Sequence, residues 1–187
     1  FRAELLGKIL GLNGHFTAYP IERQFSDYDT TAAEIELVPG VISAVAYVEG
    51  QALAKGLSTE STGVSVRGVD SVNLQKLTLL HEGAQLGGWD QWDASGGVAI
   101  GTRLAQKLGL TIGDPLTILN PGGTLTPFGQ TPQVRSYPVN VIFDLGMVEF
   151  DSFYVYMPMQ AAQTYFRMYE DVLKPGVVYS VFNQPPF

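Results

Sequence analysis

Residues 120–135 of this chain read Asn-Pro-Gly-Gly-Thr-Leu-Thr-Pro-Phe-Gly-Gln-Thr-Pro-Gln-Val-Arg, without a charged side chain before Arg135. Proline and glycine recur through the stretch, and both residue types break helices and are typical of turns. The flanking residues 116–119 and 139–143 are rich in strand formers. We therefore expect a long loop between two paired strands, and such a loop is usually functional or disordered. Its apolar centre, 125–128, is unfavourable in water unless something covers it.

The composition of the whole chain is that of a globular protein. It has 187 residues, of which 45% are hydrophobic and 16% are charged. The net charge of −7 argues against nucleic acid as a partner, because phosphate binding needs a basic face. The chain has no cysteine, so it contains no disulfide and no thiolate metal site.

Membrane spans and a leader peptide are both missing from the sequence pattern. The longest apolar run, residues 41–48, is interrupted by Ser43 and is too short to cross a bilayer. Residues 1–12 carry charges and no cleavage pattern, and the first residue is not methionine. We expect a domain excised from a longer protein, with its cellular address encoded outside it.

Hydrophobic periodicity and turn residues predict an α+β chain. A capping box at Thr31–Glu34 is expected to start a helix, and Gly109 to end another in the left-handed conformation. Residues 82–97 are expected to form a loop, and 174–176 a turn. The expected helices are 1–12, 31 to before 39, 71–78, 102–108 and 158–169. The expected strands are 15–19, 41–49, 51–58, 64–68, 97–101, 116–120, 137–143, 153–157 and 177–182.

The two histidines give little support to catalysis or metal binding. A catalytic triad needs a nucleophile and an orienting carboxylate, yet the chain has neither a Gly-x-Ser-x-Gly motif nor a cysteine. His81 stands beside Glu82 without the second histidine that zinc spacing requires. His15 follows Gly14 at an expected helix-to-strand corner. We expect structural roles for both histidines, and neither a metal nor a cofactor.

Two further motifs contain residue types that occur in functional sites. Asp90 and Asp93 lie beside two tryptophans, a pattern found in glycoside hydrolases and in sugar-binding sites. The same residues in a glycine-flanked loop also serve turns and local packing, which is the interpretation we favour. Residues 96–101 are rich in glycine but have neither the dinucleotide nor the Walker order, so we expect no ATP binding. Arg135 could meet an acidic partner at the base of the loop or pair with a carboxylate of this chain.

A series of short motifs runs through the chain in a fixed order and spacing. It comprises Phe1-Arg2, Glu4-Leu5, Gly11, Gly14-His15, Gly68-x-Asp70, Val98-Ala-Ile-Gly101, Leu104-Ala105, Leu108-Gly109-Leu110, Gly113-Asp114, Pro121, Thr126-Pro127-Phe128-Gly129, Gly146-Met147, Glu149 and Asp151. Through these motifs the chain resembles the periplasmic domain of the LolC/LolE permeases. These are the membrane subunits of the lipoprotein-releasing ABC transporter, within the wider group of MacB-like and FtsX-like permeases.

The resemblance implies a two-lobed α+β fold. Residues 1–60 and 144–187 would form a β-α-β porter-like lobe. Residues 61–143 would form an inserted, strand-rich, sabre-like lobe that bears a projecting hairpin, the hook, at 120–135. The implied protein is not an enzyme and belongs to the inner membrane, with this domain in the periplasm.

The resemblance also implies partners. The hook would recruit the periplasmic chaperone LolA, to which outer-membrane lipoproteins pass as cargo. A second permease subunit, of the same or a related chain, and a separate cytoplasmic ATPase would complete the transporter. The implied LolA-binding residues are Pro121, Gly122, Gly123, Thr124, Leu125, Thr126, Pro127, Phe128, Gly129, Gln130, Thr131, Pro132 and Gln133, with Arg135 from a basic pad.

The chain departs from the LolC pattern at several positions. Thr117 and Val134 stand where that pattern has Arg and Gln, and Gly146-Met147-x-Glu149 is more similar to LolE. A combination of both patterns would fit a fused-type permease that pairs with itself. The alternatives are another MacB-like or FtsX-like permease with a different partner and, less favoured, a carboxylate-based hydrolase.

Overall fold

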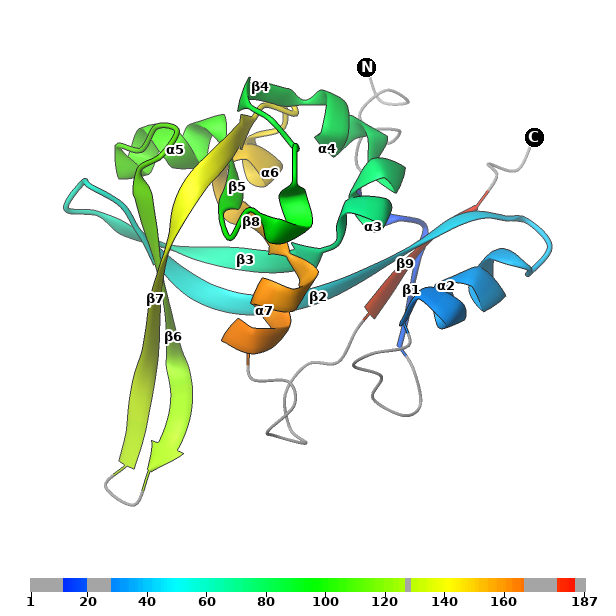
Figure 1. The fold of residues 1–187 in the computed structure, drawn as a ribbon, viewed down its shortest axis with the longest axis horizontal. Coiled ribbons are helices and arrows are strands. Elements are labelled where there is room, and N and C mark those ends of the chain that lie inside the picture. The colour runs from blue at the N-terminus through cyan, green and yellow to red at the C-terminus, as the bar shows by residue number, and fades with distance from the viewer. Residues whose placement is uncertain (1–11, 20–27, 127–128, 167–177, 184–187) are drawn as a thin grey trace.

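A computed structural model describes residues 12–19, 28–126, 129–166 and 178–183 (Figure 1). The helix expected at 1–12 falls almost wholly outside these residues, and the turn expected at 174–176 wholly so. The described helices are α2 (Tyr28–Glu36), α3 (Ser71–Lys76), α4 (Thr78–Glu82), the 3-10 helix η1 (Trp92–Ala94), α5 (Thr102–Leu108), α6 (Val148–Phe153) and α7 (Met159–Tyr165). The described strands are β1 (Phe16–Ala18), β2 (Val41–Lys55), β3 (Ser61–Val69), β4 (Ala84–Gly87), β5 (Val98–Gly101), β6 (Pro115–Thr126), β7 (Gly129–Phe143), β8 (Tyr154–Pro158) and β9 (Val178–Asn183).

These strands form one mixed sheet, as the expected α+β class requires. Its order is β1-β9-β2-β3-β8-β5-β7-β4, and β6 pairs with both β2 and β7. The pairs β3–β8 and β5–β7 are parallel, and the other pairs are antiparallel. Because β6 connects β7 back to β2, the strands β2, β3, β8, β5, β7 and β6 close into a ring. Ring closure leaves these strands few unpaired edges.

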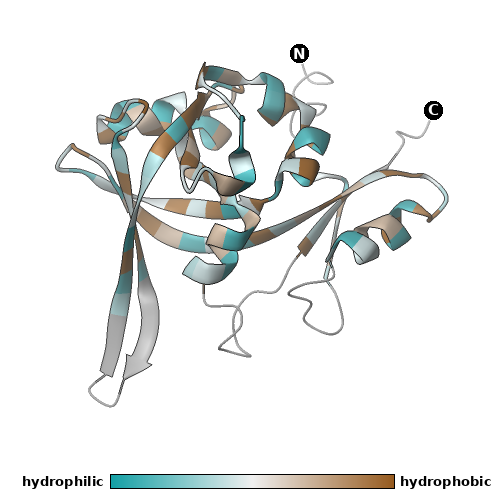
Figure 2. Ribbon diagram, viewed as in Figure 1, coloured by the Kyte–Doolittle hydropathy of each residue, from teal (hydrophilic) through white to brown (hydrophobic). Residues whose placement is uncertain are grey.

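The core lies on both faces of the strands. Successive residues of a strand point to opposite faces, so Val155 and Tyr156 of β8 belong to different apolar clusters. One cluster joins the strands to α5 and α7, and the other joins them to α3, α4 and Trp92 of η1. Figure 2 shows apolar residues recurring along the central strands. Helices α3 to α6 lie at the end of the molecule opposite the tips of β6 and β7 (Figure 1).

Strand β2 differs from expectation because it is continuous where two strands were predicted. The predicted break fell at Gly50, yet Gly50 pairs with Val66 in an uninterrupted ladder with β3. A Cβ atom at Gly50 would lie 2.4 Å from the ring of Phe166. Glycine is therefore needed there for a close approach to the end of α7, not for a turn.

Two other local predictions were wrong, and several were right. Helix α2 begins at Tyr28, so Thr31 lies inside it and the capping box is not used. The apolar face of α2 positions the helix instead, because Ala32 is buried and Tyr28 and Ile35 pack against the same core. Residues 82–97 hold β4 and η1 rather than a plain loop. Gly109 ends α5 with φ of 66°, as predicted.

A buried cation ties three segments together on one face of the sheet. The Arg67 Nε atom donates to Glu49 Oε2 at 2.9 Å, and another guanidinium nitrogen donates to Asn13 Oδ1 at 2.9 Å. The guanidinium carbon lies 4.9 Å from the ring centre of Tyr47 and 4.5 Å from that of Tyr154. Arg67 is only 7% exposed. Its charge is thus compensated by one carboxylate and two aromatic faces.

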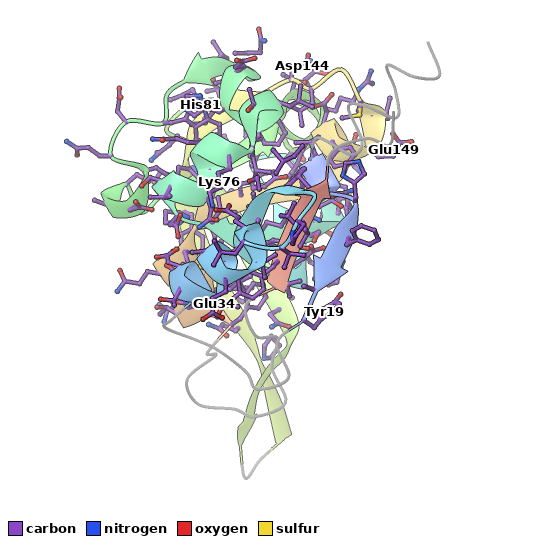
Figure 3. The ribbon with its side chains drawn as sticks, turned by 90° about the vertical axis from the view of Figure 1, so that its right-hand side faces the viewer. Tyr19, Glu34, Lys76, His81, Asp144 and Glu149 are labelled. Atoms are coloured by element: carbon purple, nitrogen blue, oxygen red, sulfur yellow. The ribbon has the colours of Figure 1, made fainter. Side chains whose placement is uncertain are left out.

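A second polar cluster fastens two helices to β2. Lys76 Nζ donates to Glu36 Oε1 at 2.7 Å and to the carbonyl of Ala44 at 3.0 Å. The backbone N–H of Ala44 donates to the same Glu36 oxygen at 2.9 Å. Figure 3 labels Lys76, which lies above α2 in that view. Burial by itself would raise the pKa of Glu36, but the Ala44 N–H and the Lys76 ammonium hold that pKa below its ordinary value.

We expect Arg67→Ala to lower the free energy of unfolding by about 3 kcal/mol, because it leaves Glu49 unpaired and removes stacking on two rings. Urea denaturation followed by circular dichroism measures the change. Lys55→Ala, at an exposed cation of β2, is the matched control and should change stability by less than about 0.5 kcal/mol. Equal effects of the two substitutions would contradict the role given to Arg67.

We expect Glu36→Gln to lower the free energy of unfolding by about 1 kcal/mol at neutral pH. A carboxyl whose pKa is lower in the folded state stabilises the fold above its unfolded pKa, about 4.3. That contribution is lost as the pH falls through the folded-state pKa. Urea denaturation should therefore show the variant to be less stable than wild type at neutral pH and equally stable near pH 3. A stability difference that is unchanged at the lower pH would exclude an ionic contribution.

Candidate functional site

The candidate site is the antiparallel ribbon of β6 and β7. Paired residues run from Pro115 opposite Pro138 to Thr126 opposite Gly129. Strand β2 pairs with β6 only at residues 117–119, and β5 pairs with β7 only from Val139 onward. Among the described residues, the distal parts of β6 and β7 therefore pair only with each other. In Figure 1 these parts extend away from the rest of the sheet.

The long loop expected at 120–135 is largely strand, so that expectation was wrong. The ladder is interrupted once: Asn120 pairs with Gln133 and Thr124 with Thr131, with an irregularity between. Pro121, Gly122 and Gly123 thus face Pro132 where the ladder is broken. Proline lacks a backbone N–H, and a bulge is where a strand tolerates it. The prolines indicate a bulge in this ribbon, not the end of its strands.

The implied tip residues are partly described. Thr124, Leu125 and Thr126 pair with Thr131, Gln130 and Gly129, respectively. Pro127 and Phe128 lie outside the described residues, and the structure describes only the backbone of the others between 121 and 131. The register therefore places Thr126 and Gly129, the two outer residues of the predicted Thr-Pro-Phe-Gly motif, at the far end of the ribbon from its base.

At the base of the ribbon, one face is a continuation of the core face of the sheet. Its side chains become polar where the ribbon leaves the core. Residues directly opposite each other on paired strands share a face. Ile118, which is fully buried, lies opposite Arg135, and Asn120 lies opposite Gln133. Asn120, Gln133 and Arg135 therefore share the core-side face. Arg135 itself is exposed, and it makes no ion pair with the described carboxylates.

The other face of the base is apolar. Leu119 of β6 lies opposite both Leu53 of β2 and Val134 of β7, so the three side chains form a row across three strands. Leu53 is 40% exposed and Val134 is 52% exposed. We call this row the apolar strip. No local sequence pattern predicts the apolar strip, because pairing between β2 and β6 joins residues far apart in the chain.

The base of the ribbon is firmly held. Leu116 and Ile118 are fully buried. The hydroxyls of Thr117 and Ser136 lie 2.9 Å apart on the apolar-strip side. Tyr137 meets Tyr165 of α7 edge to face, with ring centres 6.3 Å apart. The burial that this packing produces raises the pKa of Tyr137, against the opposing charge of Arg135. These contacts fix the direction in which the ribbon leaves the ring.

The structure brings the two carboxylates that are candidates for catalysis to the same hollow, and one of them is engaged by a neighbouring serine. Asp90 and Asp93 border one hollow, yet the Asp93 carboxylate accepts the backbone N–H and the hydroxyl of Ser71. His81 stacks on Trp89 with ring centres 6.2 Å apart. The backbone N–H of His15 donates to the Val181 carbonyl at 2.8 Å. In the described ranges, no three His, Cys, Asp or Glu side chains gather to hold a metal ion.

None of the helices in the described part of the chain has the length and apolarity needed to cross a bilayer.

Comparison with known proteins supplies a family. The family model described as "MacB-like periplasmic core domain" matches residues 7–181. A similar curated protein is the lipoprotein-releasing system transmembrane protein LolC of Neisseria meningitidis serogroup B, 25% identical over 173 residues. That match covers 92% of this chain but only 41% of the relative, so the chain spans about two fifths of its length.

Two solved structures share the fold. The extracellular domain of the noncanonic ABC-type transporter YknZ from Gram-positive bacteria has a TM-score of 0.52 at 16% identity, over 87% of this chain and 81% of that one. The periplasmic region of MacB from Actinobacillus actinomycetemcomitans has a TM-score of 0.51 at 11% identity, over 98% and 82% of the two chains. At these identities the likeness concerns the fold alone.

Proposed function

Because this chain belongs to the MacB-like periplasmic core domain family, we propose that it is the periplasmic domain of an inner-membrane ABC transporter permease. It recruits the chaperone LolA through the hook and helps to pass outer-membrane lipoproteins to it. The observation that carries this proposal is the β6–β7 ribbon, whose distal strands pair only with each other among the described residues. Similarity to LolC over 92% of the chain supports the choice of partner.

The ribbon has the chemistry to engage a carrier of acyl chains. Such a carrier must contain an apolar cavity, and a ribbon that brings Leu125 and Phe128 to its rim offers apolar contacts there. Pro121 and Pro132 restrict the backbone, which reduces the entropy lost on docking. The outer edges of the distal parts of β6 and β7 pair with no other described strand, and such edges can add to an edge of the partner's sheet. An aromatic anchor such as Phe128 would supply much of the binding energy.

The base of the ribbon adds a second contact area. The apolar strip of Leu53, Leu119 and Val134 lies on one face, and Arg135 with Gln133 lies on the other. A partner that clasps the ribbon would cover the strip and place acidic side chains near Arg135. The apolar strip extends the proposed contact beyond the residues implied by sequence, while the polar face retains the pad position at Arg135.

In the proposed transporter, this chain works beside other subunits. The chain contributes binding and not catalysis. ATP is hydrolysed on a separate cytoplasmic subunit, and a second permease subunit stands beside this one. Residues 1–60 with 144–187 form the porter-like lobe, and 61–143 form the sabre-like lobe with its projecting hook. The pairings β3–β8 and β5–β8 cross the boundary between these two sets, so the proposed lobes would move as one body.

A second candidate is a MacB-like permease domain with a partner other than LolA. The substitutions at the pad favour it, since Thr117 and Val134 replace the Arg and Gln of the LolC pattern. Thr117 is occupied in a contact with Ser136 and Val134 is apolar, so neither supplies a charge. Failure of the unmodified domain to bind LolA would favour this candidate.

We expect Phe128→Asp, or deletion of Leu125–Gly129, to weaken binding of LolA at least about 30-fold, the effect of losing a hot-spot anchor. A charge at the tip could not enter an apolar cavity without a large desolvation cost. Calorimetric titration of this chain with LolA measures the affinity, and circular dichroism checks that the fold is unchanged. Leu37→Asp, at a site 82% exposed outside the hairpin, is the matched control and should bind normally. Unaltered affinity of the Phe128 variant would exclude the hook assignment.

We expect Arg135→Glu to slow association with LolA and weaken binding about 10-fold at low ionic strength, because it reverses a charge at the rim of the contact. The loss should shrink as salt is raised, since exposed charges are screened. Stopped-flow or surface-plasmon measurements over a range of salt concentrations resolve the association rate. Arg103→Glu, at an exposed position of α5, changes the net charge equally and should leave the rate near that of wild type. Identical behaviour of the two variants would show that only net charge matters.

A further inference from the structure

A polar hollow of about 490 Å³ lies away from the hook, between the start of α3, the end of α4 and the turn that leads into η1. His81, on α4, is near the top of the molecule in Figure 3, whereas the distal ends of β6 and β7 are at the bottom in Figures 1 and 3. The hollow is therefore distinct from the proposed LolA contact. The proposed function makes no use of it.

The aromatic wall of the hollow is held rigidly. Trp92 is 2% exposed, and its Nε1 donates to the Val69 carbonyl at 2.9 Å. Trp89 Nε1 donates to the His81 carbonyl at 2.9 Å, and the Trp89 ring meets the Trp92 ring edge to face at 5.2 Å. The Trp92 N–H donates to the Trp89 carbonyl at 3.1 Å and closes the turn between them. Trp89 is thus pre-positioned and only half-buried.

The turn contains a strained backbone position. Gln91 has φ of 52° and ψ of 34°, and among the described residues it is the non-glycine residue with positive φ. Such a conformation costs a glutamine roughly 1 kcal/mol, and residues held in it cluster at binding sites. Glycine would remove the strain but also the amide group. The presence of glutamine at this strained position indicates that its amide group contributes to binding.

The polar side chains around Trp89 suit a ligand rich in hydroxyl groups. Gln75, Asp90 and Gln91 border the hollow and are exposed. Each amide offers donors and an acceptor, and the carboxylate accepts from two neighbouring hydroxyls. In the part of the chain that the structure describes, the hollow is bordered by Asp90 and Asp93 and by no lysine or arginine, which disfavours an anionic ligand. One face of the half-buried Trp89 ring stacks on His81, so the C–H groups of a pyranose would pack against the electron-rich face that His81 does not cover.

We propose that this hollow binds a neutral saccharide, with one pyranose ring stacked on Trp89 and its hydroxyls bonded to Asp90 and to the amides of Gln75 and Gln91. Binding occurs without hydrolysis. A glycosidase needs two available carboxyl groups, and Asp93 is engaged by Ser71 through both of its oxygens. The chain thereby gains a contact to glycan that is separate from its protein partner.

The chain's two tryptophans, Trp89 and Trp92, both border the hollow, so intrinsic fluorescence reports occupancy directly. Titration with chitotetraose and with maltotetraose should give a saturable change for at least one, with a Kd on the order of 1 mM or tighter. The sugar should be recovered uncleaved. Absence of saturation with both sugars, or release of reducing ends, would overturn the proposal.

Substitutions at the hollow test whether the saccharide binds there. Asp90→Ala and Gln91→Ala each should weaken the saccharide at least about 5-fold in calorimetric titration, while Gln106→Ala, an exposed glutamine of α5, should not. Trp89→Ala should abolish binding, and the two milder variants keep the test decisive if that protein unfolds. Equal affinity in all variants would contradict the site. Binding of tetramethylammonium without any binding of saccharide would show instead that the aromatic rings and Asp90 form a cation site.

Discussion

The pairing of β6 with β2 is the constraint on which the rest of this molecule depends. Three residue pairs, Leu53 with Leu119, Ala54 with Ile118 and Lys55 with Thr117, join the strands. They close the ring of β2, β3, β8, β5, β7 and β6, inside which Ala54, Leu116 and Ile118 are fully buried. They also decide where β6 leaves the sheet, since its residues beyond Leu119 have only β7 as a neighbour among the described strands. A single short ladder thus fixes both the core and the origin of the ribbon.

This arrangement makes the ribbon an extension of the ring and not an appended loop. Strand β7 runs without a break from the distal pairs into its parallel pairing with β5 at Val139 to Phe143. Any rotation of the ring would therefore be transmitted to the tip through continuous backbone. In the proposed transporter, movement that follows ATP hydrolysis on another subunit would reposition the hook in this way. The apolar strip lies at the base of the ribbon, where a partner bound to it would be displaced by the same movement.

Sequence alone predicted those elements whose signals are local. Helix α5 with Gly109 in the left-handed conformation, β8 and the start of α7 after Pro158 follow from turn chemistry and short-range periodicity. The sequence pattern predicts a break in β2 at Gly50. The structure shows that glycine is needed there because the ring of Phe166, distant in the sequence, packs too closely for a side chain. The proline and glycine pattern predicts a loop where the ribbon lies, because these residues occupy a bulge whose pairing with β7 cannot be read from the local sequence. Within the candidate site, the tip motif came from family resemblance, and the strip formed by Leu53, Leu119 and Val134 was invisible without the β2–β6 register.

In the proposed function, LolA binds the distal ribbon while the ring stays unchanged. Nuclear magnetic resonance of this chain, labelled with ¹⁵N and titrated with unlabelled LolA, tests it directly at residue resolution. We expect the amide signals of the non-proline residues in 121–135 to shift or broaden first, followed by those of Leu53 and Leu119. The indole signals of Trp89 and Trp92 should stay in place. Perturbations that gather elsewhere on the domain, with the signals of residues 121–135 unmoved at saturation, would contradict it.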